Sequence, residues 1–117
     1  MRRVIVESPY KGSFWQRWRN RVYARACVRD CIERGEAPFA SHLLYTQRGI
    51  LDDSDPVERW RGIAAGLAWV EVADATVVYI DHGITGGMVA GIQAAEIRGR
   101  PVERRRLTGD GNGKEAT

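Results

Sequence analysis

The stretch of sequence that decides the fold is Asp74-Ala75-Thr76-Val77-Val78-Tyr79-Ile80, which runs directly into Asp81-His82-Gly83. It is rich in β-branched residues and apolar along nearly its whole length, as is typical of a strand buried on both faces of a parallel sheet. The following segment, Ile84 to Met88, contains two adjacent glycines and leads into a helical pattern from about Thr85 to Arg98. We therefore predict a central strand followed by a helix.

Strand and helix patterns alternate on both sides of this stretch. We expect strands at Arg3 to Glu7, Ala37 to Ser41 and Arg100 to Leu107, helices at Trp15 to Arg34 and from Pro56 onward, and a long loop from His42 to Ser54. Asp55, Pro56 and Glu58 form a start signal for the second helix. This alternation predicts an α/β, three-layer sandwich with a four-stranded parallel sheet in the order 2-1-3-4 and helices on both faces.

Helical spacing also predicts which side chains are buried. In the first helix Ala24, Cys27, Val28 and Cys31 share one face, and in the second helix Trp60, Ile63, Ala64 and Leu67 do so. We interpret the two cysteines as small core residues, because the two histidines lack the spacing of metal ligands. We therefore expect no metal and no cofactor.

Length and composition limit the class of protein. The 117 residues, 44% of them hydrophobic, suit one domain, which we place at residues 1–107 with a disordered, Gly-rich and charged tail at 108–117. No apolar run is long enough for a membrane span or a secretory signal, so we expect a cytoplasmic protein. The net charge of +3 favours an anionic ligand without requiring nucleic acid.

Ligands of open parallel sheets bind beyond the carboxyl ends of the strands. Three segments fall there, namely Glu7 to Gly12, His42 to Ser54 and Asp81 to Met88. The candidate ligand-binding residues in them are Ser8, Pro9, Tyr10, His42, Asp81, Gly83, Thr85, Gly86, Gly87 and Met88. The glycines before the third helix allow close approach of an anion such as phosphate to the helix N-terminus, and an ordinary tight turn is the alternative.

Glu7 is the most unusual of the candidate residues. It is a carboxylate at the end of a strand that is otherwise suited to burial, and a buried charge without a partner is costly. It must therefore be paired or face the ligand cleft. Asp52 and Asp53 are further acidic candidates, which we interpret as solvated loop residues.

Several segments together resemble the nucleoside 2-deoxyribosyltransferase-like superfamily, in a branch of small bacterial and phage proteins without an assigned activity. The matching pieces are Val4 to Tyr10, Ala40 to Gln47, Leu51 to Pro56, Ala73-Asp74 and Gly87-Met88. The resemblance implies a Rossmann-like (flavodoxin-like) sheet, a nucleoside or nucleoside monophosphate site, and cleavage of the N-glycosidic bond by a glutamate three residues after the Gly-Met pair. Gly91 stands at that position here, and we include it among the ligand-binding residues.

Three functions remain open from the sequence. The first is a nucleoside- or nucleotide-binding protein without efficient turnover, which we favour. The second is an N-glycosidase or deoxyribosyltransferase in which Glu7 supplies the catalytic carboxylate. The third is a nucleic-acid-binding protein that uses Trp15, Trp18 and the arginines of the first helix, which we favour less than a solvated helix face with the two Trp side chains packed on the body. We also expect a homodimer or larger homo-oligomer, because four Trp are hard to bury in so small a core.

Overall fold

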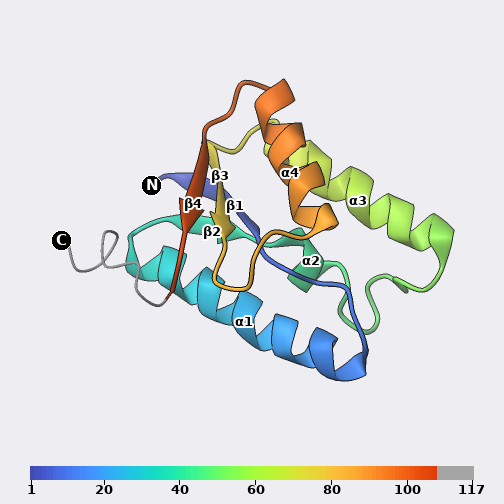
Figure 1. Cartoon of the computed structure of the whole chain (residues 1–117). Helices are drawn as coiled ribbons and strands as arrows, with labels where there is room; N and C mark the ends of the chain where they lie inside the picture. Colours follow the sequence, from blue (N-terminus) through green and yellow to red (C-terminus); the bar gives the residue numbers. More distant parts are fainter. Residues whose placement is uncertain (108–117) are drawn as a thin grey trace.

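The structure is a computed structural model, and it describes residues 1–107. The predicted disordered tail, residues 108–117, lies outside the described residues. The elements in chain order are β1 (Arg3–Glu7), α1 (Phe14–Glu33), β2 (Ala37–Phe39), α2 (Ser41–Leu44), α3 (Pro56–Val70), β3 (Ala75–Tyr79), α4 (Gly86–Ile97) and β4 (Val102–Arg105) (Figure 1).

The four strands form one parallel sheet in the order β2-β1-β3-β4, as predicted. β3 lies between β1 and β4, and all five of its residues are buried. The register aligns Glu7 of β1 with Val78 of β3. The carboxyl ends of β1 and β3 therefore meet at the same edge, which is where the candidate residues of the two strand ends come together.

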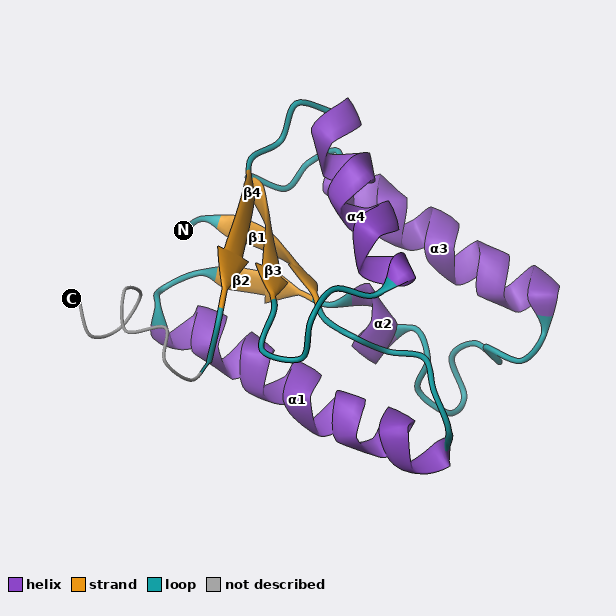
Figure 2. Ribbon diagram, in the orientation of Figure 1, coloured by secondary structure: helices purple, strands orange, loops and turns teal. Residues whose placement is uncertain are grey.

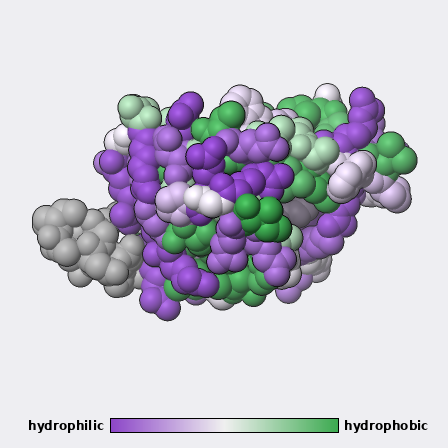
Figure 3. All heavy atoms as spheres, turned by 90° about the horizontal axis from the view of Figure 1, so that it is seen from above, coloured by the Kyte–Doolittle hydropathy of each residue, from purple (hydrophilic) through white to green (hydrophobic). Residues whose placement is uncertain are grey.

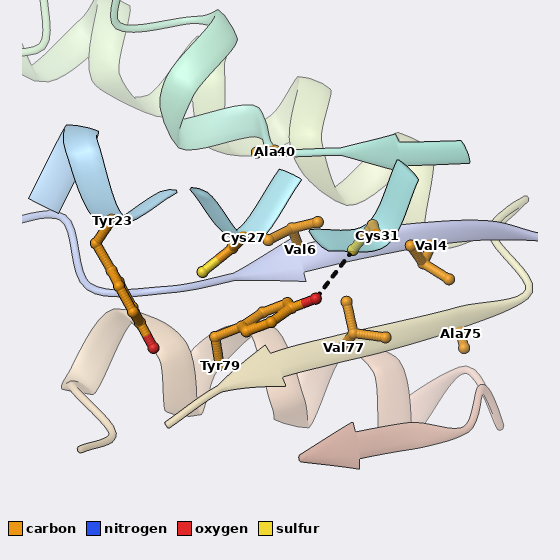
Figure 4. Close-up of a cluster of buried hydrophobic side chains, with 9 residues drawn as sticks. All are labelled: Val4, Val6, Tyr23, Cys27, Cys31, Ala40, Ala75, Val77 and Tyr79. Carbon is orange, nitrogen blue, oxygen red and sulfur yellow. Dashed lines mark hydrogen bonds between the residues drawn. The ribbon is translucent and has the colours of Figure 1, made fainter. Parts of the chain in front are cut away.

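The layers of the sandwich are α1 on one face of the sheet and α3 with α4 on the other (Figure 2). The core under α1 contains both cysteines, as the helical spacing predicted (Figure 4). Its buried members are Val4, Val6, Tyr23, Cys27, Cys31, Ala40, Ala75, Val77 and Tyr79. Burial raises the pKa of both thiols, which keeps them protonated and unreactive.

The core on the opposite face is built mainly by α4. Met88 and Ile92 pack with Val78 of the sheet, and Ala95 packs with Ile5. Thr85 caps the helix by accepting a hydrogen bond from the Met88 backbone N–H, 3.4 Å away. These contacts fix the rotation of α4, so that Gly91, one residue before Ile92, faces the end of β1.

The predicted buried stripe of α3 is wrong. Trp60 is 62% exposed and Ile63 is 44% exposed, and Val70 is the buried residue of this helix. The helix instead lies close to α2 and the following loop through two glycines: a Cβ on Gly66 would lie 3.0 Å from Ser41 Oγ, and one on Gly62 would lie 3.1 Å from Leu51. Apolar periodicity could not find this face because glycine carries no apolar side chain.

The start of α3 follows the prediction. The Asp55 carboxylate accepts hydrogen bonds from the backbone N–H groups of Val57 and Glu58, with Pro56 in the first turn. The preceding segment differs, because the expected loop from His42 to Ser54 begins inside the short helix α2. None of the helices within residues 1–107 is both long enough and apolar enough to cross a membrane.

Candidate functional site

Glu7 and Gly91 face each other across the edge of the sheet. Glu7 is the last residue of β1, and Gly91 lies in the second turn of α4. A Cβ built on Gly91 would lie 2.2 Å from Glu7 Oε2 and 2.3 Å from Glu7 Cδ. The Glu7 carboxyl group therefore occupies the space into which any side chain at position 91 would extend. A glycine is required there as long as Glu7 keeps this position.

The Glu7 carboxyl is shielded from water and lacks a protein partner. Among the described residues, no hydrogen bond or ion pair to its oxygens is present, and burial alone raises its pKa to about 8. The group is therefore mostly protonated at neutral pH, so that it can both donate and accept a hydrogen bond. A polar group in such surroundings is typical of a site that a ligand completes.

Ser8, His42 and Tyr10 form a second part of the site next to Glu7. The Ser8 hydroxyl, which is buried, is hydrogen-bonded to His42 Nε2 at 2.7 Å. The Tyr10 ring lies edge-on to the His42 ring with a centroid distance of 6.4 Å. Burial lowers the pKa of His42 to about 4, so the imidazole is neutral at physiological pH. The structure thus joins the end of β1 to α2 through uncharged polar groups.

The N-terminus of α4 is open to solvent. Gly86 and Gly87 are exposed, and a Cβ on either would meet nothing within 4 Å. Their backbone N–H groups belong to the first turn of the helix, where an anion is favoured. The glycines are therefore not required by contact with the protein itself, in contrast to Gly91.

Asp81 and Gly83 make hydrogen bonds within the protein at this edge of the sheet. The Asp81 carboxylate accepts hydrogen bonds from the Tyr23 hydroxyl at 2.5 Å and from the Leu107 backbone N–H at 2.9 and 3.1 Å. Gly83 has a φ of +84° and closes the turn after β3 by donating from its N–H to the Ile80 carbonyl. Pro9 is buried and lines a small hollow of about 270 Å³ together with His82.

A cavity with a volume of about 620 Å³ lies between the first half of α1 and the segment after α2. Its lining includes Tyr10, Phe14, Arg17, Arg21, Thr46, Arg48, Asp52, Asp53 and Glu58. Tyr10 is the one residue shared with the sequence-predicted set. The Thr46 hydroxyl donates to the His42 carbonyl at 2.6 Å, so the cavity wall adjoins the Ser8–His42 pair, while Glu7 itself does not line it.

Sequence analysis missed the arginines of this cavity as site residues. Arg17 and Arg21 belong to the arginine run on the first helix, and Arg48 lies in the stretch predicted as a long loop. Asp53, interpreted from sequence as a solvated loop residue, also lines the cavity, and its charge contributes to the raised pKa of the Tyr10 hydroxyl, whose main cause is burial. Within residues 1–107 no group of three or more His, Cys, Asp or Glu side chains is arranged to hold a metal ion.

Comparison with known proteins identifies a family and a fold. The family model described as "Domain of unknown function (DUF7768)" matches residues 2–105. No curated protein matches the chain. Among solved structures, the chain is similar to a 2-deoxyribosyltransferase from the psychrotolerant bacterium Bacillus psychrosaccharolyticus, with a TM-score of 0.64 and 21% sequence identity over 92% of this chain and 74% of that one. That enzyme is described as a biocatalyst for the synthesis of nucleosides, and the similarity establishes a shared Rossmann-like α/β fold.

Proposed function

The chain belongs to the family described as Domain of unknown function (DUF7768), and we propose that it binds a nucleoside or nucleotide at the carboxyl edge of its sheet. The fold shared with a 2-deoxyribosyltransferase supports this class of ligand. The observation that carries the proposal is the position of Glu7, whose half-buried side chain lacks a hydrogen-bond or ion-pair partner among the described residues and fills the space beside Gly91. A sugar hydroxyl or a base nitrogen supplies the missing hydrogen bonds.

The neighbouring groups suit the remaining parts of such a ligand. Tyr10 offers a ring for a base or sugar, and the Ser8–His42 pair offers neutral hydrogen-bonding groups. Arg17, Arg21 and Arg48 line the cavity beyond Tyr10 and would contact phosphate, which guanidinium groups bind in a bidentate manner. The exposed N–H groups of Gly86 and Gly87 at the start of α4 are a second place for an anion. This arrangement favours a nucleoside monophosphate over a free nucleoside.

The protonation state of Glu7 favours binding over efficient turnover. A carboxylate nucleophile has to be ionised to attack an anomeric carbon, and a pKa of about 8 keeps Glu7 mostly neutral at pH 7. The second candidate is an N-glycosidase or deoxyribosyltransferase that uses Glu7 as its carboxylate. Its support is that the Glu7 carboxyl lies beside position 91, where the superfamily resemblance places a glutamate. Such turnover would rise as pH increases through 8.

The deciding experiment compares wild type, Glu7→Gln and the double variant Glu7→Ala/Gly91→Glu on a panel of nucleosides and monophosphates. The double variant is needed because a side chain at position 91 would collide with Glu7. Thermal shift reports binding, and chromatography of free base reports turnover. We expect wild type to bind a monophosphate without releasing base, and Glu7→Gln to bind with similar affinity because the amide, like the protonated carboxyl, both donates and accepts a hydrogen bond.

The outcomes separate the candidates. Base release by wild type that is lost in Glu7→Gln would establish the enzyme and refute binding without turnover. Base release by the double variant alone would support a binding protein on an enzyme's scaffold. If no nucleoside or nucleotide shifts the melting temperature of wild type, the assignment of this edge as a nucleotide site is wrong.

We also propose that the chain forms a homodimer or larger homo-oligomer through α3. This helix leaves large apolar side chains exposed on its outer side, among them Val57, Trp60 and Ile63. Hydrophobic residues also reach the surface of the face seen from above in Figure 3, between hydrophilic ones. Exposed apolar side chains of this size are typical of interfaces. A monomer mass by light scattering at working concentration would contradict the proposal, and Trp60→Arg should dissociate the oligomer if it is correct.

A further inference from the structure

The outer face of α1 carries Trp15, Trp18, Arg25 and Arg29, none of which lines the cavity assigned to the nucleotide. Phe14, Trp15 and Trp18 are 63%, 70% and 52% exposed. The prediction that the two Trp side chains pack on the body of the protein is therefore wrong. Phe14 and Trp15 contact each other edge to face, with ring centroids 5.2 Å apart, and form a small aromatic surface at the start of the helix.

Charge is distributed unevenly along the chain. Residues 11–29 contain six basic residues, Lys11, Arg17, Arg19, Arg21, Arg25 and Arg29, and no acidic residue. The rest of the chain holds twelve basic and 15 acidic residues, a formal charge of −3. In the described part of the chain, Arg29 pairs with Glu33, and the other four arginines of this segment make no ion pair. Arg25, which lines neither hollow and makes no ion pair with the described residues, is therefore free to meet an anionic partner.

The arrangement of these side chains around the helix identifies the partner. The buried side of α1 is set by Tyr23, Ala24 and Cys27. On the opposite side, the spacing of 3.6 residues per turn interleaves Trp18 with Arg25 and Arg29, and places Trp15 beside them. Aromatic rings for stacking between guanidinium groups for phosphates are the pattern by which proteins hold single-stranded nucleic acid.

Two other occupants of the same face are disfavoured. A helix that lies in a membrane interface separates its apolar face from its charged face, whereas the aromatic and basic residues of α1 share one side. In a symmetric contact with a second copy, Arg25 and Arg29 would face the same two arginines of that copy and repel them. From this geometry we infer that the outer face of α1 binds single-stranded nucleic acid. The inference goes beyond the proposed function, because Trp15, Trp18, Arg25 and Arg29 line neither of the two hollows described above.

The test is fluorescence anisotropy with a labelled, mixed-sequence 20-nucleotide DNA single strand, measured over a range of NaCl concentrations. Wild type should bind with an affinity that falls steeply with salt. Trp15→Ala/Trp18→Ala removes the stacking surface and should weaken binding about tenfold or more. Arg25→Gln/Arg29→Gln should reduce the slope of log affinity against log salt by about 1.4, because each phosphate contact to a single strand contributes about 0.7.

The matched control is Ile97→Ala/Arg104→Gln, which removes an exposed apolar side chain from α4 and an exposed Arg from β4. It should bind the single strand as wild type does. The inference is overturned if this control loses as much affinity as Trp15→Ala/Trp18→Ala, if a blunt duplex of the same sequence binds as tightly as the single strand, or if wild type binds vesicles of anionic lipid and not the oligonucleotide. Nucleoside binding by Arg25→Gln/Arg29→Gln should remain unchanged, so that failure here is distinct from failure of the proposed function.

Discussion

The ends of β1 and β3 lie side by side in the sheet, and each places a carboxyl group at the same edge in opposite surroundings. Asp81, after β3, accepts hydrogen bonds from the Tyr23 hydroxyl and the Leu107 backbone. Glu7, at the end of β1, has no such partner among the described residues and lies against a glycine. The comparison shows that an acidic residue after an apolar strand indicates either a structural contact or a ligand site, and that the contacts distinguish the two.

The largest effect on stability is expected from removing the Asp81 carboxylate. Asp81→Ala leaves the Tyr23 hydroxyl and the Leu107 N–H without their acceptor, and we expect a loss of about 3 kcal/mol in the free energy of unfolding, measured in urea. Burial and the hydrogen bond to Asp81 raise the pKa of Tyr23, so its hydroxyl stays a donor. Glu7→Gln, compared with Asp81→Ala at pH 5, serves as the contrast and should change stability by less than about 1 kcal/mol. Equal losses in both variants would remove the distinction between the two strand ends.

The space beside Glu7 is tested by Gly91→Ala, with Gly87→Ala as the matched control. An added methyl group at position 91 would meet the Glu7 carboxyl, whereas one at position 87 meets nothing within 4 Å. Although alanine gains roughly 1 kcal/mol over glycine in a helix interior, we expect Gly91→Ala to destabilise the protein by about 1–2 kcal/mol.

A double-mutant cycle attributes this loss to Glu7. Glu7→Ala/Gly91→Ala should recover stability relative to Gly91→Ala, with a coupling free energy of about 1 kcal/mol or more. If Gly91→Ala is as harmless as Gly87→Ala and the cycle shows no coupling, the two residues do not share this space in solution.

The pH dependence of stability follows from the raised pKa of Glu7. The folded state holds the proton up to about pH 8 while the unfolded chain releases it near 4.5, so the contribution of Glu7 to stability is present below pH 4.5 and is lost as pH rises toward and through 8. Glu7→Gln has no carboxyl group to ionise, so its stability does not fall for this reason as pH rises. We expect the variant to gain about 2 kcal/mol on wild type between pH 5 and pH 6.5, measured by urea unfolding across that range. Parallel curves would mean that Glu7 is ionised in the folded protein.

The sheet could be predicted from sequence, because each strand and helix of a parallel α/β fold has a recognisable pattern of apolar residues within a short stretch of the chain. The apolar run from Ala75 to Tyr79 and the cap at Asp55 involve residues close together in the chain, and the structure confirms them. The packing of α3 was predicted wrongly for the opposite reason. Its closest approach to α2 uses Gly62 and Gly66, which carry no side chain that a periodicity search can detect.

The candidate site was predictable only in part. The position of Glu7 was noticed because a carboxylate is unusual at the end of a buried strand, but its contact with Gly91 joins residues 84 positions apart. The hydrogen bond between Asp81 and the Leu107 backbone joins residues 26 positions apart and left no local signal. From the sequence, Arg17 and Arg21 could be recognised only as part of a run of arginines on a helix. That they line one cavity with Arg48 depends on the path of the loop after α2.

The smallest effect concerns Ser8, the residue directly after Glu7. Ser8→Ala removes the hydroxyl that is hydrogen-bonded to His42 Nε2, and we expect a loss of about 1 kcal/mol in stability. Because burial lowers the pKa of His42 to about 4, below its unfolded value of 6.5, the His42 contribution is present above pH 6.5 and is lost as pH falls through 4. Burial rather than Ser8 causes this shift, so the stability curve of Ser8→Ala should run parallel to that of wild type from pH 7 to pH 4, offset by the same amount. His42→Gln should flatten the curve over that range. If Ser8→Ala flattens it as well, the hydroxyl and not burial holds His42 neutral, and the end of β1 then controls the charge of the site through Ser8.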